Sequence, residues 1–461
     1  MAFAKPYSLS EVLLKARTAL AAWLLVAMLA PCSAQNWESI GLPSRVIDWG
    51  NFYLDTVNNA LYASGINQVF PGQTGIFRSN GNDWDTLGYF GNAVFSTLIF
   101  QDTLIAAGGF YTVNGDSTSF ISFMDSTGWH PYGSFDAGIW RLRVLDGELY
   151  AVGGFETVDG QSADGIAKRV GGHWEPVGDF GVVPQPYLFD VIKYNGELVC
   201  CGNMSIIGQN YRDVYIFQNG QWGPLGGGLY GSVSGGWVMT IYHNELILGG
   251  NFYLGAGNAG QCIMRWNGSI WQPLGVGTTD NNDSYSSSYN IHALCVHDDK
   301  LFVGGGFSYA GHVPAQGIAT WDGSQWCGLG SQLGLVHDIV FFNDSLYVMC
   351  GNQIIDGDTN TGGVRYLHTT YADTCSLTTG VNALAPPAEA AIIVSDEGVE
   401  VLHLPDGRIS YSIIDAAGRV VRSGSMASNG GRSSVITTGD LATGLYVLRT
   451  LDGRALPFVP Y

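Results

Sequence analysis

Apolar residues recur along this chain in short runs that end in glycine, as in the segment from Leu104 to Phe110 (Leu-Ile-Ala-Ala-Gly-Gly-Phe). The copies begin at Leu61, Leu104, Leu149, Leu198, Leu246, Leu301 and Leu346, and those at Leu61, Leu198 and Leu346 are the weaker ones. A pair such as Asp146-Gly147 or Asn195-Gly196 precedes many of them. Such pairs accept the positive φ angles of tight hairpins, so each copy predicts two antiparallel strands.

A second motif, Trp-x-x-apolar-Gly, alternates with these runs. It begins at Trp37, Trp84, Trp129, Trp174, Trp222, Trp271 and Trp326. The intervals between successive tryptophans are 47, 45, 45, 48, 49 and 55 residues, which is the length of a four-stranded propeller blade. Each unit therefore predicts strand A, a tight turn, strand B, a longer loop, strand C, a tight turn, and a strand D that carries the tryptophan.

The number of motifs predicts how the ring closes. Six units lie between successive tryptophans, and a further unit over residues 331–376 has strands A to C but no closing tryptophan. The motif at Trp37 is a strand D without a blade of its own. Placing it in the last unit leaves no exposed sheet edge, so we predict an all-β chain with a seven-bladed β-propeller over residues 35–376. The alternative gives the last unit its own strand around Tyr371 and leaves the N-terminal strand as an edge cover.

The unit over residues 305–326 resembles the repeats of bacterial Kelch-like propellers and of the fungal cortical polarity-marker propellers. The resemblance extends over roughly residues 36–376 and implies the fold, whereas repeats of this class serve many functions. The first and seventh units depart most from the pattern, because they lack the double glycine and the phenylalanine.

The composition changes after Cys375. Residues 377–389 predict a linker, and alternating apolar residues then predict a small, Ig-like β-sandwich over residues 390–461. This segment resembles type IX secretion sorting domains of type A, whose Asp-x-x-Gly-Arg and Leu-x-x-Gly-x-Tyr motifs correspond to Asp415, Gly418, Arg419, Leu441, Gly444 and Tyr446. The resemblance implies the type IX secretion machinery of a Bacteroidota-type cell as partner, and removal of the domain after export. The alternative is an ordinary accessory β-sandwich.

The first 34 residues have the pattern of a secretory signal peptide. Lys15 and Arg17 precede an apolar run of 12 residues, which is short for a membrane span, and cleavage is expected after Ala34. Lipidation at Cys32 is the alternative, although the preceding proline fits it poorly. No later segment predicts a transmembrane helix, so the mature chain is expected outside the cell or on the outer-membrane surface.

Seven cysteines follow the signal peptide, and this odd number leaves at least one of them outside an intramolecular disulfide. Cys200, Cys201 and Cys350 lie within apolar strand patterns and are interpreted as small buried hydrophobic residues. Export permits disulfides, and Cys327 with Cys375 is the pair to test first.

Charge and motifs limit the chemistry. Lys and Arg number 20 against 39 Asp and Glu, a net charge of -19, which repels phosphate backbones and argues against nucleic-acid binding. The sequence contains no Gly-x-Ser-x-Gly, His-Glu-x-x-His or P-loop motif, and its scattered histidines are interpreted as surface or loop residues. Asp356, Asp358 and Asn360 resemble the start of a calcium loop. Thr361 and Leu367 replace its glycine and glutamate, so we interpret it as a polar loop and expect no cofactor.

Topology then sorts the loops, because tight A–B and C–D turns share one face and the longer B–C and D–A connections share the other. We expect a ligand on the second face, around the channel mouth. The candidate residues there are Tyr111, Tyr253, Tyr309, His312, Asp280, Asp283 and Tyr285. The repeated tryptophans are interpreted as packing residues. The sequence favours a non-catalytic binding protein for a glycan or another protein. A glycan-active enzyme and a structural part of a surface layer are the alternatives.

Overall fold

The computed structural model divides into two compact units, residues 1–376 and residues 377–461. The residues it describes are 37–43, 48–66, 74–79, 83–180, 187–204, 213–230, 235–279, 290–329, 333–351, 354–355, 358–359, 362–366, 392–395, 398–401, 407–415, 420–429, 432–438, 441, 446–450 and 455–458. The predicted signal peptide and linker lie outside them, as do Cys32 and Cys375. Among the described residues, none belongs to a helix long and apolar enough to cross a membrane.

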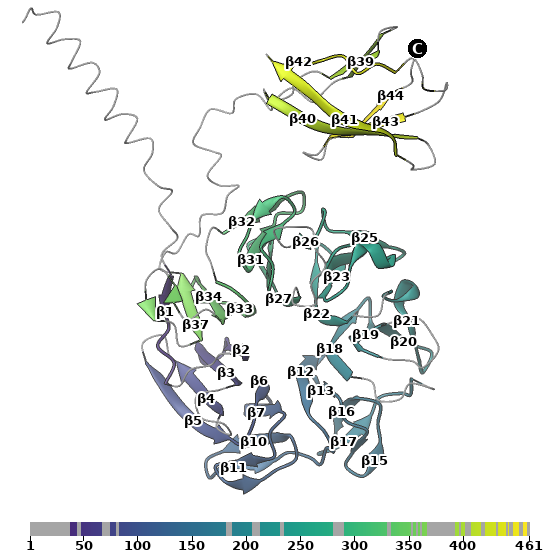
Figure 1. The fold of residues 1–461 in the computed structure, drawn as a ribbon. Helices are drawn as coiled ribbons and strands as arrows, with labels where there is room; N and C mark the ends of the chain where they lie inside the picture. Colours follow the sequence, from purple (N-terminus) through teal and green to yellow (C-terminus); the bar gives the residue numbers. More distant parts are fainter. Residues whose placement is uncertain are drawn as a thin grey trace, which may run out of the picture. The chain divides into compact units, whose positions relative to one another are not determined.

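The first unit is a ring of antiparallel blades, each with four strands (Figure 1), and the sheet of the first blade continues into a hairpin. The first four are blade 1, with β2 (Asp48–Asp55), β3 (Ala60–Ile66), β4 (Thr74–Ser79) and β5 (Trp84–Phe90); blade 2, with β6 (Val94–Phe100), β7 (Thr103–Gly108), β10 (Ile121–Asp125) and β11 (Gly128–Pro131); blade 3, with β12 (Ile139–Leu145), β13 (Glu148–Gly153), β16 (Ile166–Val170) and β17 (His173–Pro176); and blade 4, with β18 (Tyr187–Tyr194), β19 (Glu197–Asn203), β20 (Val214–Gln218) and β21 (Gln221–Pro224).

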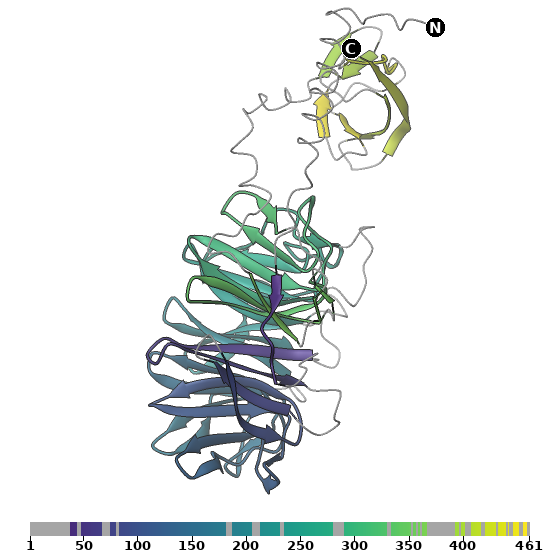
Figure 2. The same cartoon turned by 90° about the vertical axis from the view of Figure 1, so that its left-hand side faces the viewer.

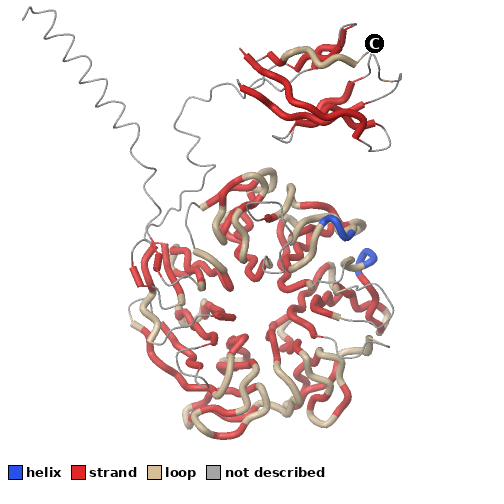
Figure 3. Tube along the Cα trace, in the orientation of Figure 1, coloured by secondary structure: helices blue, strands red, loops and turns tan. Residues whose placement is uncertain are grey.

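Three further sheets complete the ring within the described part of the chain. They are blade 5, with β22 (Gly236–Tyr242), β23 (Glu245–Gly250), β24 (Ile263–Trp266) and β25 (Trp271–Pro273); blade 6, with β27 (Ile291–His297), β28 (Lys300–Gly305), β31 (Ile318–Trp321) and β32 (Trp326–Gly328); and blade 7, with β33 (Val336–Phe342), β34 (Ser345–Cys350), β37 (Gly363–Tyr366) and β1 (Trp37–Ser39). Figure 3 shows how completely strands dominate this unit. The prediction of an all-β propeller is confirmed.

The N-terminal strand closes the ring, as the stray tryptophan motif predicts. Strand β1 pairs with β37 of blade 7, with Trp37 opposite Tyr366 and Glu38 opposite Arg365. Glu38 and Arg365 also form an ion pair. In Figures 1 and 2 the purple strand lies beside the green strands of blade 7. Trp37 is buried in the same cluster as Leu329 of blade 6, so the strand joins a blade rather than covering an edge.

Short hairpins occupy several of the B–C loops. They are β8 (Thr112–Val113) with β9 (Asp116–Ser117), β14 (Thr157–Val158) with β15 (Gln161–Ser162), β29 (Tyr309–Ala310) with β30 (Val313–Pro314), and β35 (Ile354–Ile355) with β36 (Asp358–Thr359). The preceding D–A connections pair with some of them: β26 (Thr278–Thr279) pairs with β29, and the end of β5 pairs with β8. Two 3-10 turns, Leu225–Gly227 and Leu254–Ala256, complete these connections. The pairings place both kinds of loop on one face.

The tryptophan motif links each blade to the next. The Trp129 Nε1–H donates to the Leu87 carbonyl at 2.9 Å, and Leu87 is the apolar residue of the preceding motif. The same bond joins Trp84 to Ile40, Trp174 to Tyr132, Trp222 to Val177, Trp271 to Leu225 and Trp326 to Leu274. The motif glycine leaves room for the ring, because a Cβ on Gly88 would lie 2.5 Å from Trp129 Nε1. These tryptophans are scaffold residues, as predicted.

Most of the described cysteines are buried and are not disulfide-bonded. Cys200, Cys201, Cys262 and Cys350 are buried as thiols, and Cys295 is a half-buried thiol. Cys327 is disulfide-bonded. Cys375 lies outside the described residues, so its pairing with Cys327 stays a prediction that mass spectrometry of the non-reduced chain can test.

The second unit contains a five-stranded sheet and a separate hairpin. The sheet has the order β42 (Arg432–Ser433), β41 (Val420–Asn429), β40 (Gly407–Asp415), β43 (Tyr446–Thr450) and β44 (Ala455–Phe458), and the hairpin joins β38 (Ile392–Ser395) to β39 (Gly398–Val401). A bridge from Val399 to Ile436 links the two parts. Tyr446 is buried in the core of this unit and Leu441 packs against that core, so two of the motif residues have a packing role. Asp415 lies in β40, whereas Gly418, Arg419 and Gly444 lie outside the described residues.

Candidate binding site at the channel mouth

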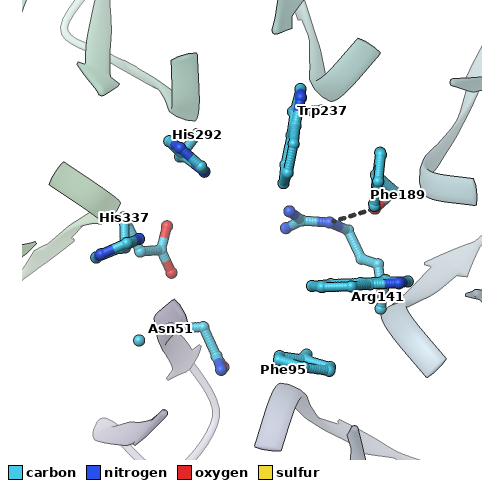
Figure 4. Close-up of a pocket in the computed structure, with 10 residues that line it drawn as sticks. Asn51, Phe95, Arg141, Phe189, Trp237, His292 and His337 are labelled. Atoms are coloured by element: carbon cyan, nitrogen blue, oxygen red, sulfur yellow. Dashed lines mark hydrogen bonds between the residues drawn. The ribbon is translucent and has the colours of Figure 1, made fainter. Parts of the chain in front are cut away.

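The innermost strand of each blade carries a β-bulge near its start, at the end reached from the D–A connection. In blade 3, for example, the register with β13 shifts between Ile139 and Arg141, so that Trp140 has no partner. A bulge redirects a side chain. The corresponding residues of blades 2 to 7 are Phe95, Trp140, Phe189, Trp237, His292 and His337, and Gly50 occupies this place in blade 1. All of them line one cavity at the centre of the ring (Figure 4).

The six ring-bearing residues form a continuous belt, which we call the aromatic belt. Phe95 stacks on Trp140 with ring centroids 4.2 Å apart, and Phe189 stacks on Trp237 at 4.4 Å. Edge-to-face contacts join Trp140 to Phe189 at 5.3 Å and Trp237 to His292 at 5.1 Å. Offset-stacked and edge-to-face pairs are the favourable aromatic arrangements. Because blade 1 contributes only Gly50, the belt is open on that side.

In blades 1, 2, 4 and 7, the residue after the bulge has a polar side chain that ties neighbouring blades together. The Asn51 side-chain amide donates to the Val94 carbonyl at 3.2 Å, and Ser96 Oγ accepts the Leu142 N–H at 3.0 Å. The Asp190 carboxylate accepts the Met239 N–H at 2.9 Å, and Asp338 accepts the Phe52 N–H at 2.7 Å across the closure of the ring. Blades 5 and 6 have Val238 and Ala293 at this place. These bonds fix the positions of the belt residues.

Two arginines of blade 3 face the channel beside Asp190. Arg143 donates from Nε and Nη2 to the two oxygens of Asp190, at 2.9 and 2.8 Å. Although burial alone would raise the pKa of Asp190, the nearby charges of Arg143 and Arg141 hold it below its usual value. Burial likewise opposes the charge of Arg143, and the facing Asp190 outweighs it and raises the arginine pKa. Both partners therefore stay charged, because each is paired at close range.

Arg141 lies nearer the mouth and is bound differently. Its Nε–H donates to the Phe189 carbonyl at 3.3 Å, and Nε lies 3.4 Å from an Asp190 oxygen. Figure 4 shows its guanidinium pointing into the cavity beside Trp237. About a third of the side chain, 33%, remains accessible to solvent. Arg141 therefore brings a positive charge to the inner surface of the belt.

His292 and His337 correct one interpretation of the sequence, which placed the histidines in loops or on the surface. Both are strand residues that line the cavity, with ring centroids 5.5 Å apart. His337 is buried and His292 is half-buried. Burial, helped by the nearby His337 and Arg141, lowers the pKa of His292 to about 3. Burial raises the pKa of the neighbouring Asp338, against the hydrogen bond from Phe52 and the charge of Arg141.

The structure describes four of the candidate loop residues. They share a face of the propeller but come from three different blades. Tyr111 is 58% exposed and precedes β8 in blade 2, Tyr253 precedes a 3-10 turn in blade 5, and Tyr309 and His312 belong to one hairpin of blade 6. Asp280, Asp283 and Tyr285 lie outside the described residues. These residues stay a predicted rim for the cavity.

Metal binding finds no geometric support among the described residues, where no group of three or more His, Cys, Asp or Glu side chains is arranged around a common point. Of the calcium-loop residues, only Asp358 falls in a described strand, β36, whereas Asp356 and Asn360 lie outside the described residues. The calcium loop therefore stays untested.

The aromatic belt was missed by the sequence analysis, although the sequence contains a signal for it. Phe95 precedes Leu104 by nine positions, and Trp140 precedes Leu149 by the same interval. The same spacing holds from Phe189, Trp237, His292 and His337 to the leucine that opens the next strand. An aromatic residue or histidine at a fixed place in six repeats, on a strand that surrounds a channel, indicates a lining.

No family model and no curated protein sequence matches the chain. Among solved structures, the WD40 β-propeller domain of Doa1 is 9% identical with a TM-score of 0.44, over 72% of this chain and 95% of that one. An ulvan lyase of polysaccharide lyase family PL25 is 12% identical with a TM-score of 0.37, over 76% and 100%. A periplasmic gluconolactonase of Pseudomonas aeruginosa is 13% identical with a TM-score of 0.31, over 81% and 98%.

Proposed function

We propose that this chain is a secreted or surface-displayed binding protein without catalytic activity, whose ligand enters the channel mouth at the aromatic belt. The observation that carries the proposal is the belt itself, a row of six rings from six blades with the Arg141 guanidinium inside it. Ligand sites are concave, mostly apolar and provided with a few placed polar groups. The belt has this composition, and it lies on the face of the long loops.

Binding is favoured over catalysis because the carboxylates of the channel are already engaged. Asp190 accepts from Arg143 and from the Met239 N–H, and Asp338 accepts from the N–H groups of Phe52 and Ile339. The bonds from Arg143, Met239 and Phe52 join neighbouring blades, so these carboxylates hold the ring rather than serve a reaction. An enzyme is the second candidate, and the pair of His292 and His337 next to Asp338 is the observation in its favour.

The export route is part of the proposal. The signal peptide pattern, the Kelch-like repeats and the motif residues Asp415, Leu441 and Tyr446 support a chain exported by type IX secretion, with the second unit as its sorting domain. Fractionation of a type IX-competent host tests it: the full chain is expected at the cell surface or in the medium. A chain that lacks residues 390–461 is expected to remain in the periplasm, and equal export of both would overturn the route.

The binding function is tested by screening the full chain against glycans and proteins and then measuring the hits with two variants. Trp237→Ala removes a belt residue, and it is expected to weaken binding at least about tenfold because base-of-pocket aromatics carry much of the binding energy. Val144→Ala is the control, since Val144 is 42% exposed near the opposite end of an innermost strand.

Unchanged binding by Trp237→Ala, or equal loss in both variants, would place the ligand elsewhere and overturn the proposal. Turnover of a hit by the wild-type chain, lost in His292→Gln, would favour the enzyme instead.

A further inference from the structure

Arg141 has a part of its hydrogen-bonding capacity that the described structure does not use. A guanidinium carries five N–H donors, and the contacts described above involve only its Nε. Among the residues that the structure describes, none forms a hydrogen bond with its two terminal nitrogens. By contrast, Arg143 is already paired through two of its nitrogens with the Asp190 carboxylate. The terminal edge of Arg141 is therefore the free cationic group of the belt within the described part of the chain.

The shape of this edge selects an anion. The parallel N–H groups of a guanidinium match the two oxygens of a carboxylate. The charge acts inside a cavity walled by Phe95, Trp140, Phe189 and Trp237, where the low local dielectric strengthens an ion pair relative to one in water. The same aromatic faces favour an apolar group next to the carboxylate, because burying it removes apolar surface from water.

The size of the cavity and the net charge of the chain narrow the class of ligand further. The cavity has a volume of about 50 Å³, so only a small ligand is enclosed by the belt. The whole chain carries a net charge of -19, so an approaching polyanion is repelled. Within the cavity, the Asp338 carboxylate also opposes a second negative charge.

We propose that the belt cavity binds a small acid with one carboxylate on a flat apolar body, and that Arg141 holds the carboxylate while the aromatic belt contacts the body. This inference rests on the proposed function and names the ligand class of the same site. Asp338 enters as an opposing charge, which gives the proposal a second and independent consequence: replacing Asp338 by its amide should strengthen the binding of the acid.

Calorimetric titration of the full chain at pH 7 tests the class, with phenylacetate as the probe and three comparison compounds. Phenylacetate is expected to bind. Phenylacetamide lacks the charge, acetate lacks the apolar body, and polygalacturonate is a polyanion, and each is expected to bind at least about tenfold more weakly. Equal binding of the acid and its amide would overturn the proposal, and so would preferential binding of polygalacturonate or of an acidic peptide over phenylacetate.

Variants then test whether Arg141 binds the carboxylate. Arg141→Gln is expected to weaken phenylacetate binding at least about tenfold, Arg141→Lys is expected to retain part of it, and Asp338→Asn is expected to strengthen it severalfold. Arg265→Gln is the matched control. Arg265 lies on the third strand of blade 5, pairs with Glu245 and does not line the cavity. Thermal unfolding of each variant shows whether it is folded, and unchanged binding by folded Arg141→Gln would overturn the assignment.

Failure of this proposed ligand class can be distinguished from failure of the proposed binding function. If Trp237→Ala abolishes the binding of a screened ligand while no carboxylate probe binds, the binding site stands and the ligand class is wrong. If phenylacetate binds with the same affinity to wild type, Trp237→Ala and Arg141→Gln, both proposals fail.

Discussion

At the scale of the residue, the channel holds side chains whose ionisation depends on where the fold puts them. Asp190 and Arg143 are kept charged because each faces the other at 2.8 to 2.9 Å. Burial favours the neutral form of His292, and the nearby His337 and Arg141 act in the same direction. The innermost strands thus place charged pairs and a neutral ring along the same channel, according to the surroundings of each side chain.

This difference predicts a pH dependence of stability. The pKa of His292 is lowered to about 3 in the folded chain, against about 6.5 for an unperturbed histidine. Between these values the unfolded chain takes up a proton and the folded chain does not. The contribution of His292 to the free energy of unfolding is therefore complete above about pH 6.5, and it is lost as the pH falls towards the pKa of the folded chain. His292→Phe is expected to flatten the decline in the free energy of unfolding between pH 7 and 5, by up to about 1.4 kcal/mol per pH unit.

Denaturant unfolding of the wild type and of the variant at pH 7, 6 and 5 measures the two slopes. His173→Phe is the control, because His173 is exposed in β17, and it should leave the wild-type slope unchanged. If His292→Phe declines as steeply as the wild type, the attribution to His292 is wrong.

At the scale of the element, blades are joined by a motif whose three constant positions have separate roles. The tryptophan donates, the apolar residue offers its carbonyl from the preceding blade, and the glycine leaves space for the ring. The sequence alone indicated the packing role of the tryptophans, because a residue fixed in every repeat serves the repeat. The carbonyl partner could not be predicted, because it depends on how far one blade is rotated relative to the next.

The space left by the motif glycine predicts a large effect of a small substitution. A Cβ on Gly88 would lie 2.5 Å from Trp129 Nε1, whereas a Cβ on Gly223 would meet nothing within 4 Å. Gly88→Ala is expected to cost about 1–3 kcal/mol by overpacking, and Gly223→Ala, in strand β21, is expected to cost far less. Chemical denaturation gives both values, and similar costs in the two variants would argue against this role of the glycine.

The belt shows why strand periodicity alone was insufficient. Alternation predicts which residues of a regular strand share a face, and a bulge interrupts that alternation at one residue. Trp140 lies at such an interruption, and the next residue, Arg141, lines the same cavity. Strands and blade boundaries followed from the repeats, while the lining of the channel required the positions of the bulges.

At the scale of the whole molecule, a strand of three residues, β1, joins the two ends of the propeller. Trp37 is 2% exposed and meets Tyr366 edge-to-face at 5.4 Å. The ring otherwise has covalent continuity from blade 1 to blade 7, so this seam depends on contacts alone. The seam was predictable from sequence, because the last unit lacks a closing tryptophan and the motif at Trp37 lacks a blade.

Opening the seam should therefore have a localised effect. Trp37→Ala is expected to cost about 3–5 kcal/mol and to reduce amide hydrogen-exchange protection first in β37 and β34 and in blade 1. Trp174→Ala removes an equally buried tryptophan from inside blade 3, so it should reduce protection there and leave the seam intact. Exchange that rises evenly around the ring in Trp37→Ala would contradict a separate seam.

The position of Trp37 has a consequence for the order of events in a living cell. Glu38 and its partner Arg365 lie 327 positions apart in the chain, so the first strand cannot pair until the strands of the seventh blade have been synthesised. A chain synthesised from its N-terminus therefore passes through a state in which six blades are complete and the ring is still open. The last blade to be synthesised is therefore the one whose pairing with the first strand closes the ring.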